Sequence, residues 1–221
     1  KSSFIMNIVF MVLNNASFII QWLILFSIRD NFGNYTLKQV LLLWGMASGT
    51  YGVSRFFFKR AFSLSDTITN GKLDSALVQP KNVLLSVITS DVEPSAIGDL
   101  LYAYIVLFIY GVTIPRFFLF TLLITAGGFI LASISVIVSS LSFWINKADM
   151  IADTANSLMI NFATYPDEIF KGLAKIFLFT IIPVGFTTYI PVEVLINFNA
   201  ISLLKVLGIA FSTVCLAFFI F

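Results

Sequence analysis

Apolar runs of eighteen or more residues recur along this chain of 221 residues. As an α-helix, a run of that length can cross the hydrocarbon core of a bilayer, which is about 30 Å thick. Residues of the types AVILMFWYC make up 59% of the chain and charged residues only 11%, which is not the composition of a soluble protein. The runs are also longer than the alternating ten-residue segments of a transmembrane β-barrel. The sequence predicts an all-α polytopic membrane protein, with residues 1–221 as a single transmembrane domain.

Polar turns and one longer mixed connection divide the apolar sequence into six segments. In the second segment, Gly45 and Gly49 have the GxxxG spacing, which allows close helix packing, and we do not infer dimerisation from it. The chain begins at Lys1 and stops within an apolar run at Phe221, so we expect both ends to continue in the complete protein. The expected transmembrane spans are residues 4–28, 37–58, 97–112, 117–144, 150–164 and 201–221.

Six spans place both termini on the same side of the membrane. Arg55, Lys59 and Arg60 form a cationic cluster at the end of the second span. Cationic residues beside a span favour the cytoplasm. The cluster therefore predicts that the connection after it, and both termini, are cytoplasmic.

Several functional classes are excluded by composition. The chain has no His, which removes imidazole metal ligands, HExxH zinc sites and Ser-His-Asp catalysis. Cys215 is the single cysteine, so a disulfide framework is excluded. No run of basic residues suggests a nucleic-acid partner. We expect neither a cofactor nor a metal, and we expect the lipid bilayer as the surroundings.

The connection of residues 61–96 contains a short amphipathic stretch. Leu73, Ala76 and Leu77 fall at i, i+3 and i+4, which predicts a two-turn helix with one apolar side that stops before Pro80. Such a helix can dock on a soluble partner, or it can lie on the membrane surface without one. A second short helix is expected at residues 83–88. Asp99 is interpreted as an anionic residue that suits the start of the third span.

Polar side chains lie within two of the expected spans. In the first span they repeat at helical spacing, which predicts a stripe that faces protein or water and either packs helices or lines a pathway. In the fifth span, Asp153 is expected about one turn from the interface, with a proton-relay role as the alternative. The candidates for a pathway or an interface are Asn7, Asn14, Gln21, Asp153, Asn156 and Asn161.

Two apolar pieces between the fifth and sixth spans are too short to cross a bilayer. Residues 169–182 end before Pro183, and residues 184–196 are interrupted by Pro191. They predict a re-entrant helical hairpin on one face of the membrane, within residues 166–200.

Four motifs in order carry a family resemblance. The pattern Gly71-x-Leu73-Asp74-x-x-Leu77-x-x-Pro80 is followed by Ile97-Gly98-Asp99-Leu100, Leu141-Ser142-Phe143-Trp144 and Tyr165-Pro166. Together they resemble the ABC-2-type permeases, and more narrowly the bacterial branch with six spans. The resemblance covers the whole chain.

The resemblance implies a fold and partners that composition does not show. It implies a coupling helix between spans two and three that docks on an ABC ATPase, and re-entrant helices that cap the pathway on the outer face. It also implies a bacterial cell-membrane exporter in which two like or related permeases pair. Gln79 and Lys72 depart from the Arg and Glu common in the family, which changes the expected charge pairing. The implied site residues are Gly71, Leu73, Asp74, Ala76, Leu77 and Pro80 for coupling, and Tyr165, Pro166 and Pro183 for the outer gate.

ATP would have to be hydrolysed on a partner chain. No GxxxxGK[ST] phosphate-binding loop occurs in these residues. The alternatives are an ATP-independent channel or secondary transporter, for which Asp153 is the one mid-span candidate, and a membrane-embedded enzyme, which would need a convergent set of catalytic groups. The sequence does not identify the substrate.

Overall fold

The computed structural model describes residues 2–28, 35–145, 148–170, 172–180 and 183–221, and every regular element within them is helical. The chain is therefore all-α, as its apolar runs predict. The expected span at residues 37–58 coincides with one helix, and the other expected spans differ from the observed helices by a few residues at their ends. The six longer helices are α1 (Ser2–Ile28), α2 (Leu37–Phe58), α6 (Ala96–Tyr110), α7 (Ile114–Ser139), α8 (Ala148–Ala163) and α11 (Ala200–Ile220).

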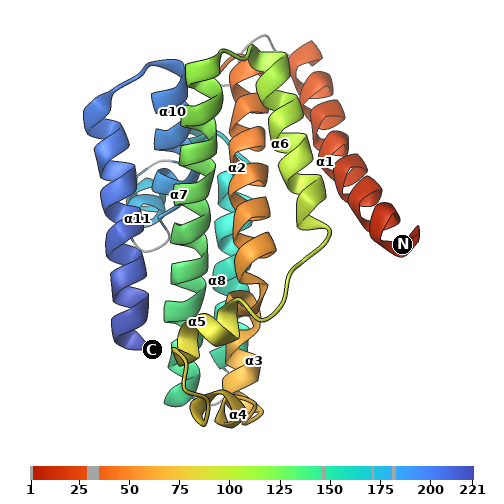
Figure 1. Cartoon of the computed structure of the whole chain (residues 1–221). Helices are drawn as coiled ribbons and strands as arrows, with labels where there is room; N and C mark the ends of the chain where they lie inside the picture. Colours follow the sequence, from red (N-terminus) through yellow and green to blue (C-terminus); the bar gives the residue numbers. More distant parts are fainter. Residues whose placement is uncertain (1, 29–34, 146–147, 171, 181–182) are drawn as a thin grey trace.

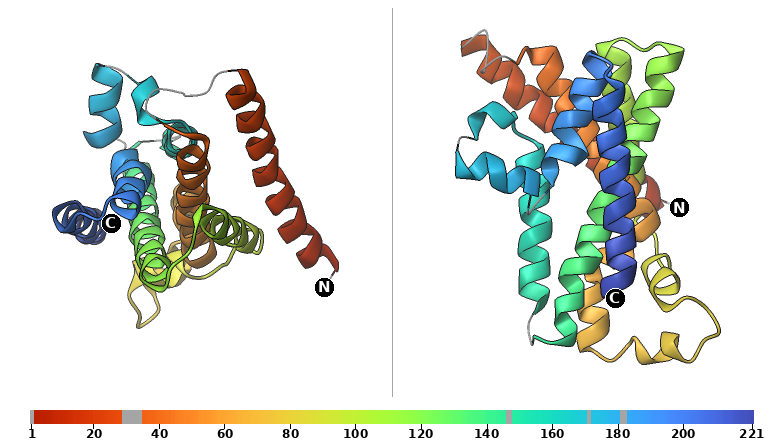
Figure 2. Two further views of the ribbon diagram at one scale, coloured as in Figure 1. Left: turned by 90° about the horizontal axis from the view of Figure 1, so that it is seen from above. Right: turned by 90° about the vertical axis from the view of Figure 1, so that its left-hand side faces the viewer.

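The longer helices form a bundle with two distinct ends (Figure 1). Helices α2 and α7 both run toward the end that carries the short helices α3, α4 and α5, and α6 and α8 run back from it (Figures 1 and 2). The turn from α6 to α7 and the connection from α10 to α11 lie at the opposite end. Helix α1 leans away from the bundle toward its N-terminus.

Helix α2 has glycines where its backbone lies close to α6 and α7. A Cβ atom on Gly45 would lie 2.8 Å from Cγ1 of Val106 in α6, and one on Gly49 would lie 2.9 Å from Cγ2 of Ile124 in α7. A larger residue at either position would push these helices apart. The interpretation of the GxxxG spacing as packing within the chain is therefore confirmed.

Three of the described helical segments are long and apolar enough to cross a membrane: Phe4–Ile28, Ile114–Phe143 and Ala200–Ile220. Helices α6 and α8, at two of the other expected spans, have 15 and 16 residues. At 1.5 Å per residue they are about 22–24 Å long, less than the hydrocarbon thickness of about 30 Å. The fold is that of a helical membrane protein, in which three of the described helices are by themselves long and apolar enough to span.

Short helices occupy both ends of the bundle. At one end, α3 was not expected, and α4 has only four residues, which is shorter than the two-turn helix expected there. Part of the expected hairpin, Lys171 with Ile181 and Ile182, lies outside the described residues. The elements at the first end are η1 (Lys59–Ser63), α3 (Leu64–Thr69), α4 (Asp74–Leu77), α5 (Val83–Ile88) and η2 (Ser140–Phe143), and those nearer the other end are η3 (Asp167–Ile169), α9 (Leu173–Thr180), η4 (Gly185–Tyr189) and α10 (Ile190–Ile196).

Candidate functional site

The outermost feature at one end of the bundle is the tip, by which we mean residues 70–82 with α4 at their centre (Figure 1). Gly71 has a φ of +66°, a left-handed conformation that favours glycine and turns the chain out of α3. Asn82 begins α5, and its side-chain Oδ1 accepts a hydrogen bond from the backbone N–H of Leu85. The tip is thus defined at both ends by local turn and capping chemistry.

The apolar residues of the tip point in two directions. Leu73 is buried and packs with Leu64 and Leu84 in a small core between the short helices and α7. Leu77 is 59% exposed and the adjacent Val78 is 84% exposed. The tip therefore buries one leucine in its own chain and leaves an apolar pair uncovered.

The other expected coupling residues surround this pair. Gly71, Asp74 and Pro80 are exposed, and Ala76 is half-buried. Asp74 lies in the first turn of α4, and its backbone N–H donates a hydrogen bond to the carbonyl oxygen of Gly71. Of the residues expected to face a partner, Leu73 is buried in the chain's own small core and Ala76 packs against that core.

Hydrogen bonds and ion pairs connect the short helices at this end to the rest of the bundle. Ser135 of α7 donates a hydrogen bond of 3.0 Å to the carbonyl oxygen of Ala61, and the hydroxyls of Ser65 in α3 and Ser142 in η2 lie 2.5 Å apart. The Lys59 ammonium lies 3.3 Å from Asp91 and 3.4 Å from Glu93, in the connection to α6. These contacts join η1 and α3, which precede the tip, to α7, η2 and the connection before α6.

Opposite charges also join η1 to the connection that precedes α6. The hydrogen bond from Lys59 holds the pKa of the Asp91 carboxyl below its usual range. The stabilisation from this pair is therefore complete above the ordinary pKa of Asp and is lost only as the pH falls through the lowered value.

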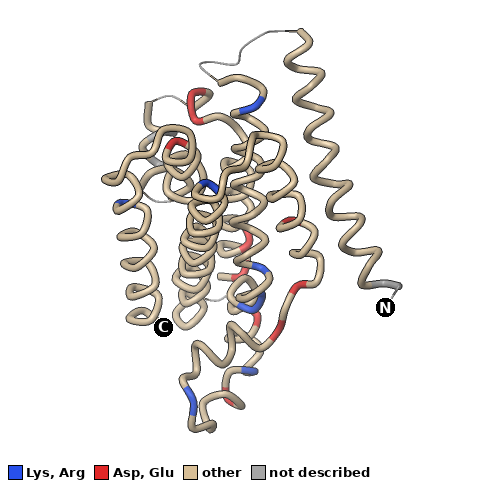
Figure 3. Tube along the Cα trace, turned by 45° about the horizontal axis from the view of Figure 1, so that its top comes forward, with Lys and Arg blue, Asp and Glu red and all other residues tan. Residues whose placement is uncertain are grey.

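Lysines, arginines and carboxylates gather in this part of the chain (Figure 3). Arg55 lies over the rings of Tyr51 and Phe62, 5.0 and 4.7 Å from their centroids.

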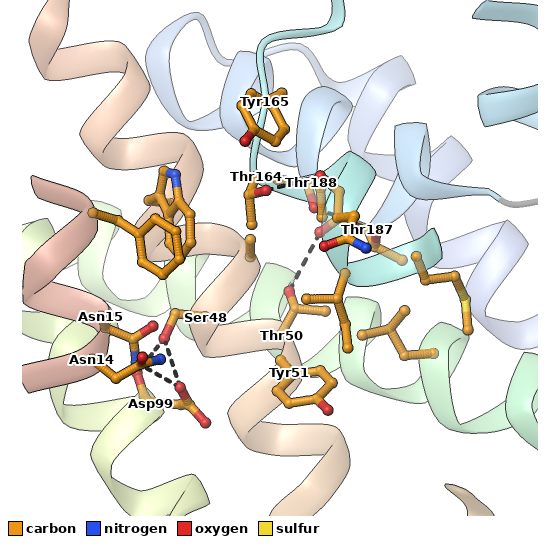
Figure 4. Close-up of a pocket in the computed structure, with 18 of the residues that line it drawn as sticks. Asn14, Asn15, Ser48, Thr50, Tyr51, Asp99, Thr164, Tyr165, Thr187 and Thr188 are labelled. Atoms are coloured by element: carbon orange, nitrogen blue, oxygen red, sulfur yellow. Dashed lines mark hydrogen bonds between the residues drawn. The ribbon is translucent and has the colours of Figure 1, made fainter. Parts of the chain in front are cut away.

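A cavity of about 240 Å³ lies between α1 and the bundle. Three of the expected polar residues line it: Asn14 of α1, Asn161 of α8 and Tyr165 just beyond α8 (Figure 4). Asn7, Gln21 and Asp153 are exposed on the described surface instead. Asn156 is buried, and its Oδ1 has no hydrogen-bond partner among the residues that the structure describes.

A buried polar junction beside this cavity was not anticipated from the sequence. Asn15 Nδ2 donates a hydrogen bond of 2.7 Å to Oδ1 of Asp99, and Ser48 Oγ lies 3.3 Å from the same oxygen (Figure 4). Asn15 and Asp99 are 4% and 3% exposed. The junction joins α1, α2 and α6, and it lies one residue away from the exposed Asn14 that the helical stripe selected.

Of the expected gate residues, Tyr165 lines the same cavity, across it from this junction (Figure 4), and Pro166 and Pro183 do not line it. Tyr165 is exposed, Pro166 is buried, and Pro183 is half-buried just before η4. Tyr35 donates a hydrogen bond of 2.7 Å to Oδ1 of Asp167, which connects the start of α2 to η3. Burial raises the pKa of the Tyr35 hydroxyl, and this hydrogen bond raises it further, so Tyr35 stays a donor at neutral pH.

Comparison with known proteins gives one match. A family model described as "ABC-2 family transporter protein" matches residues 12–221, nearly the whole chain. No curated protein and no solved structure matches the chain.

Proposed function

The chain belongs to the ABC-2 transporter family, and from this premise we propose that it is the permease subunit of an ABC exporter in a bacterial cell membrane. In this proposal, six spans cross the membrane and the tip and both termini are cytoplasmic. A separate ABC ATPase supplies the energy. A second permease, identical or related, completes the translocation pathway.

The observation that carries the proposal is the exposed apolar pair at the tip. Leu77 and Val78 project from the outermost short helix, at the end of the bundle away from η3 and α9. Uncovered apolar side chains on a well-anchored support are typical of a docking contact. We propose that this pair, with Asp74 and Pro80 beside it, contacts the ATPase.

The contacts behind the tip give a route for force. When two ATPase subunits close on ATP, movement of the tip would reach α7 through Ser135 and Ala61, and α6 through Lys59 and Asp91. At the other side of the bundle, Thr50 of α2 donates a hydrogen bond of 3.3 Å to the carbonyl oxygen of Thr187 in η4. A tilt of α2 would thereby displace η4, which we propose as part of the outer gate with Tyr165, Pro166 and Pro183.

The exposed side of α1 suits the second permease. Phe10 and Leu13 are 61% and 58% exposed, and the side chains of Asn7 and Gln21 are also exposed along this helix. Amide side chains in hydrocarbon are stabilised by a hydrogen-bond partner. A second subunit, or a pathway shared with it, would supply that partner.

Co-purification with a co-expressed candidate ATPase tests the proposal. Leu77→Asp is expected to reduce ATPase recovery at least tenfold, because a carboxylate would enter an apolar contact. Leu173→Asp is the matched control, since Leu173 is 85% exposed on α9, remote from the tip. Equal ATPase recovery with both variants, at equal permease yield, would overturn the docking assignment.

A further inference from the structure

The cavity beside α1 holds one carboxylate, Asp99, that forms no close ion pair with a described cation. Asp99 lines this cavity, and no described residue forms an ion pair with it, because the described ion pairs all join Lys59 or Arg60 to residues of the α5–α6 connection. The Arg55 guanidinium lies over two aromatic rings and acts on Asp99 only from beyond ion-pair distance. A buried carboxylate is costly unless a cation or several donors compensate it.

The junction leaves part of this carboxylate available. Both hydrogen bonds that described side chains make to it, from Asn15 and Ser48, go to Oδ1. Oδ2 receives none among the described residues, although Asp99 is 3% exposed. The hydrogen bonds to Oδ1 therefore fix the orientation of the carboxylate, and Oδ2 can still accept a hydrogen bond from a ligand.

Aromatic rings form part of the remaining wall. Phe18 and Trp44 stack with their centroids 4.1 Å apart, and both line the cavity. Trp44 is 7% exposed, and its indole Nε1 has no hydrogen-bond partner in the described part of the chain. Aromatic side chains in a cavity wall provide apolar surface for the non-polar part of a ligand and are compatible with a nearby ammonium group.

Size and composition distinguish an organic cation from a metal ion. The volume of about 240 Å³ exceeds the roughly 150 Å³ of an engineered apolar cavity that binds benzene. Hard metal cations require a shell of six or more oxygens. In contrast, Asp99 is the only carboxylate that lines this cavity among the described residues, and no group of three metal-ligating residues occurs among them.

We infer that this cavity binds an organic cation, a quaternary or protonated amine with an attached apolar group, with the ammonium beside Asp99 and the apolar part against Phe18 and Trp44. This inference rests on the proposed function only where it names that cation as the class of cargo. The binding itself requires neither ATP nor the ATPase. Asn14 and Thr164, which line the same cavity, would contact polar substituents of the ligand.

Equilibrium binding of radiolabelled benzyltrimethylammonium to the purified full chain in lipid nanodiscs tests the inference. We expect saturable binding that unlabelled benzyltrimethylammonium displaces and that its uncharged carbon isostere, neopentylbenzene, displaces at least tenfold less well. Asp99→Asn, which keeps the shape and removes the charge, is expected to weaken binding at least tenfold. Trp44→Leu, which removes the aromatic face, should also weaken it.

Asp66→Asn is the matched control, because Asp66 is an exposed carboxylate of α3 that does not line the cavity. Its affinity should stay within twofold of the unchanged protein. Thermal unfolding of each variant separates loss of binding from loss of fold, and Trp44→Leu serves if Asp99→Asn does not fold. No saturable binding to the folded, unchanged chain would overturn the inference, as would equal affinity in a folded Asp99→Asn variant or displacement of the probe by equimolar sodium.

The outcomes for the two proposals are separable. Probe binding by a chain that recovers no ATPase would leave the cation site standing and count against the exporter. ATPase recovery by a chain that does not bind the probe would overturn the cation site alone.

Discussion

At the scale of single residues, Asn15 and Asn14 are adjacent in α1 and have opposite surroundings. Asn15 is buried and donates to the carboxylate of Asp99, whereas Asn14 is exposed. Asn15→Leu should lower the free energy of unfolding by about 1–3 kcal/mol, because it removes a donor from a buried acceptor. Asn14→Leu should change it by much less. Thermal or denaturant unfolding of the two variants in the same detergent measures the difference, and equal destabilisation would contradict the role of the junction.

Gly98 is the residue at which α6 meets α1. A Cβ atom there would lie 2.8 Å from both the carbonyl oxygen of Ile8 and the Cβ of Met11. Gly98→Ala should therefore destabilise the α1 contact by about 1–3 kcal/mol, as overpacking does in well-filled interiors. Gly208→Ala is the matched control in α11, where a Cβ would meet nothing within 4 Å and where alanine favours the helix. A stability for Gly98→Ala equal to that of the control would show that α1 does not pack as described.

At the scale of elements, the two leucines of the tip have different surroundings, and we propose that only Leu77 contacts the ATPase. Leu73 is buried in the small core, and Leu77 is exposed. Leu73→Asp should destabilise the short helices by several kcal/mol, since it places a carboxylate in an apolar core, and limited proteolysis should then cut at residues 61–96. Leu77→Asp should leave the proteolysis pattern unchanged while it reduces ATPase recovery. Identical patterns for the two variants would contradict the assignment.

Elements defined by local signals could be predicted from the sequence. Helix α2 begins and ends where the apolar run does, and α5 follows an asparagine cap. Helix α3 could not be found in this way, because residues 64–69 mix polar and apolar types and pack against α7, η2 and α8. The length of α4 was overestimated for a related reason: the i, i+3, i+4 pattern includes Leu73, which precedes the helix and packs inward.

The candidate site was predictable only in part. The helical stripe in the first span selected Asn14 and Asn7, but which face of α1 meets the bundle depends on tertiary packing. Asp99 was interpreted as a residue suited to a helix start, and it does lie in the first turn of α6. Its partner Asn15 is 84 residues away in sequence, so spacing alone could not pair them. The i, i+7 spacing of Asn15 and Trp22, both buried, is the signal that marks the inward face.

At the scale of the whole molecule, the proposal places the tip and α9 on opposite sides of the membrane. Single cysteines at Ser75 and Leu173, in a Cys215→Ala background, should be modified by a membrane-impermeant maleimide from opposite faces of oriented vesicles. Both positions are exposed at remote parts of the bundle, and Cys215 is the only native cysteine. Modification of both from one face would overturn the proposed topology of six spans with a cytoplasmic tip.

The central claim is that an ATPase docks on the tip and moves the bundle through it. The most direct measurement is site-specific photocrosslinking in cells that co-express the candidate ATPase, with the photoreactive residue placed at Val78 or, as the control, at Leu173. Both side chains are more than four-fifths exposed, so the comparison depends on position and not on access. We predict an ATPase adduct from Val78 and none from Leu173. An adduct from Leu173, or none from Val78 at equal expression of the permease, would contradict the account.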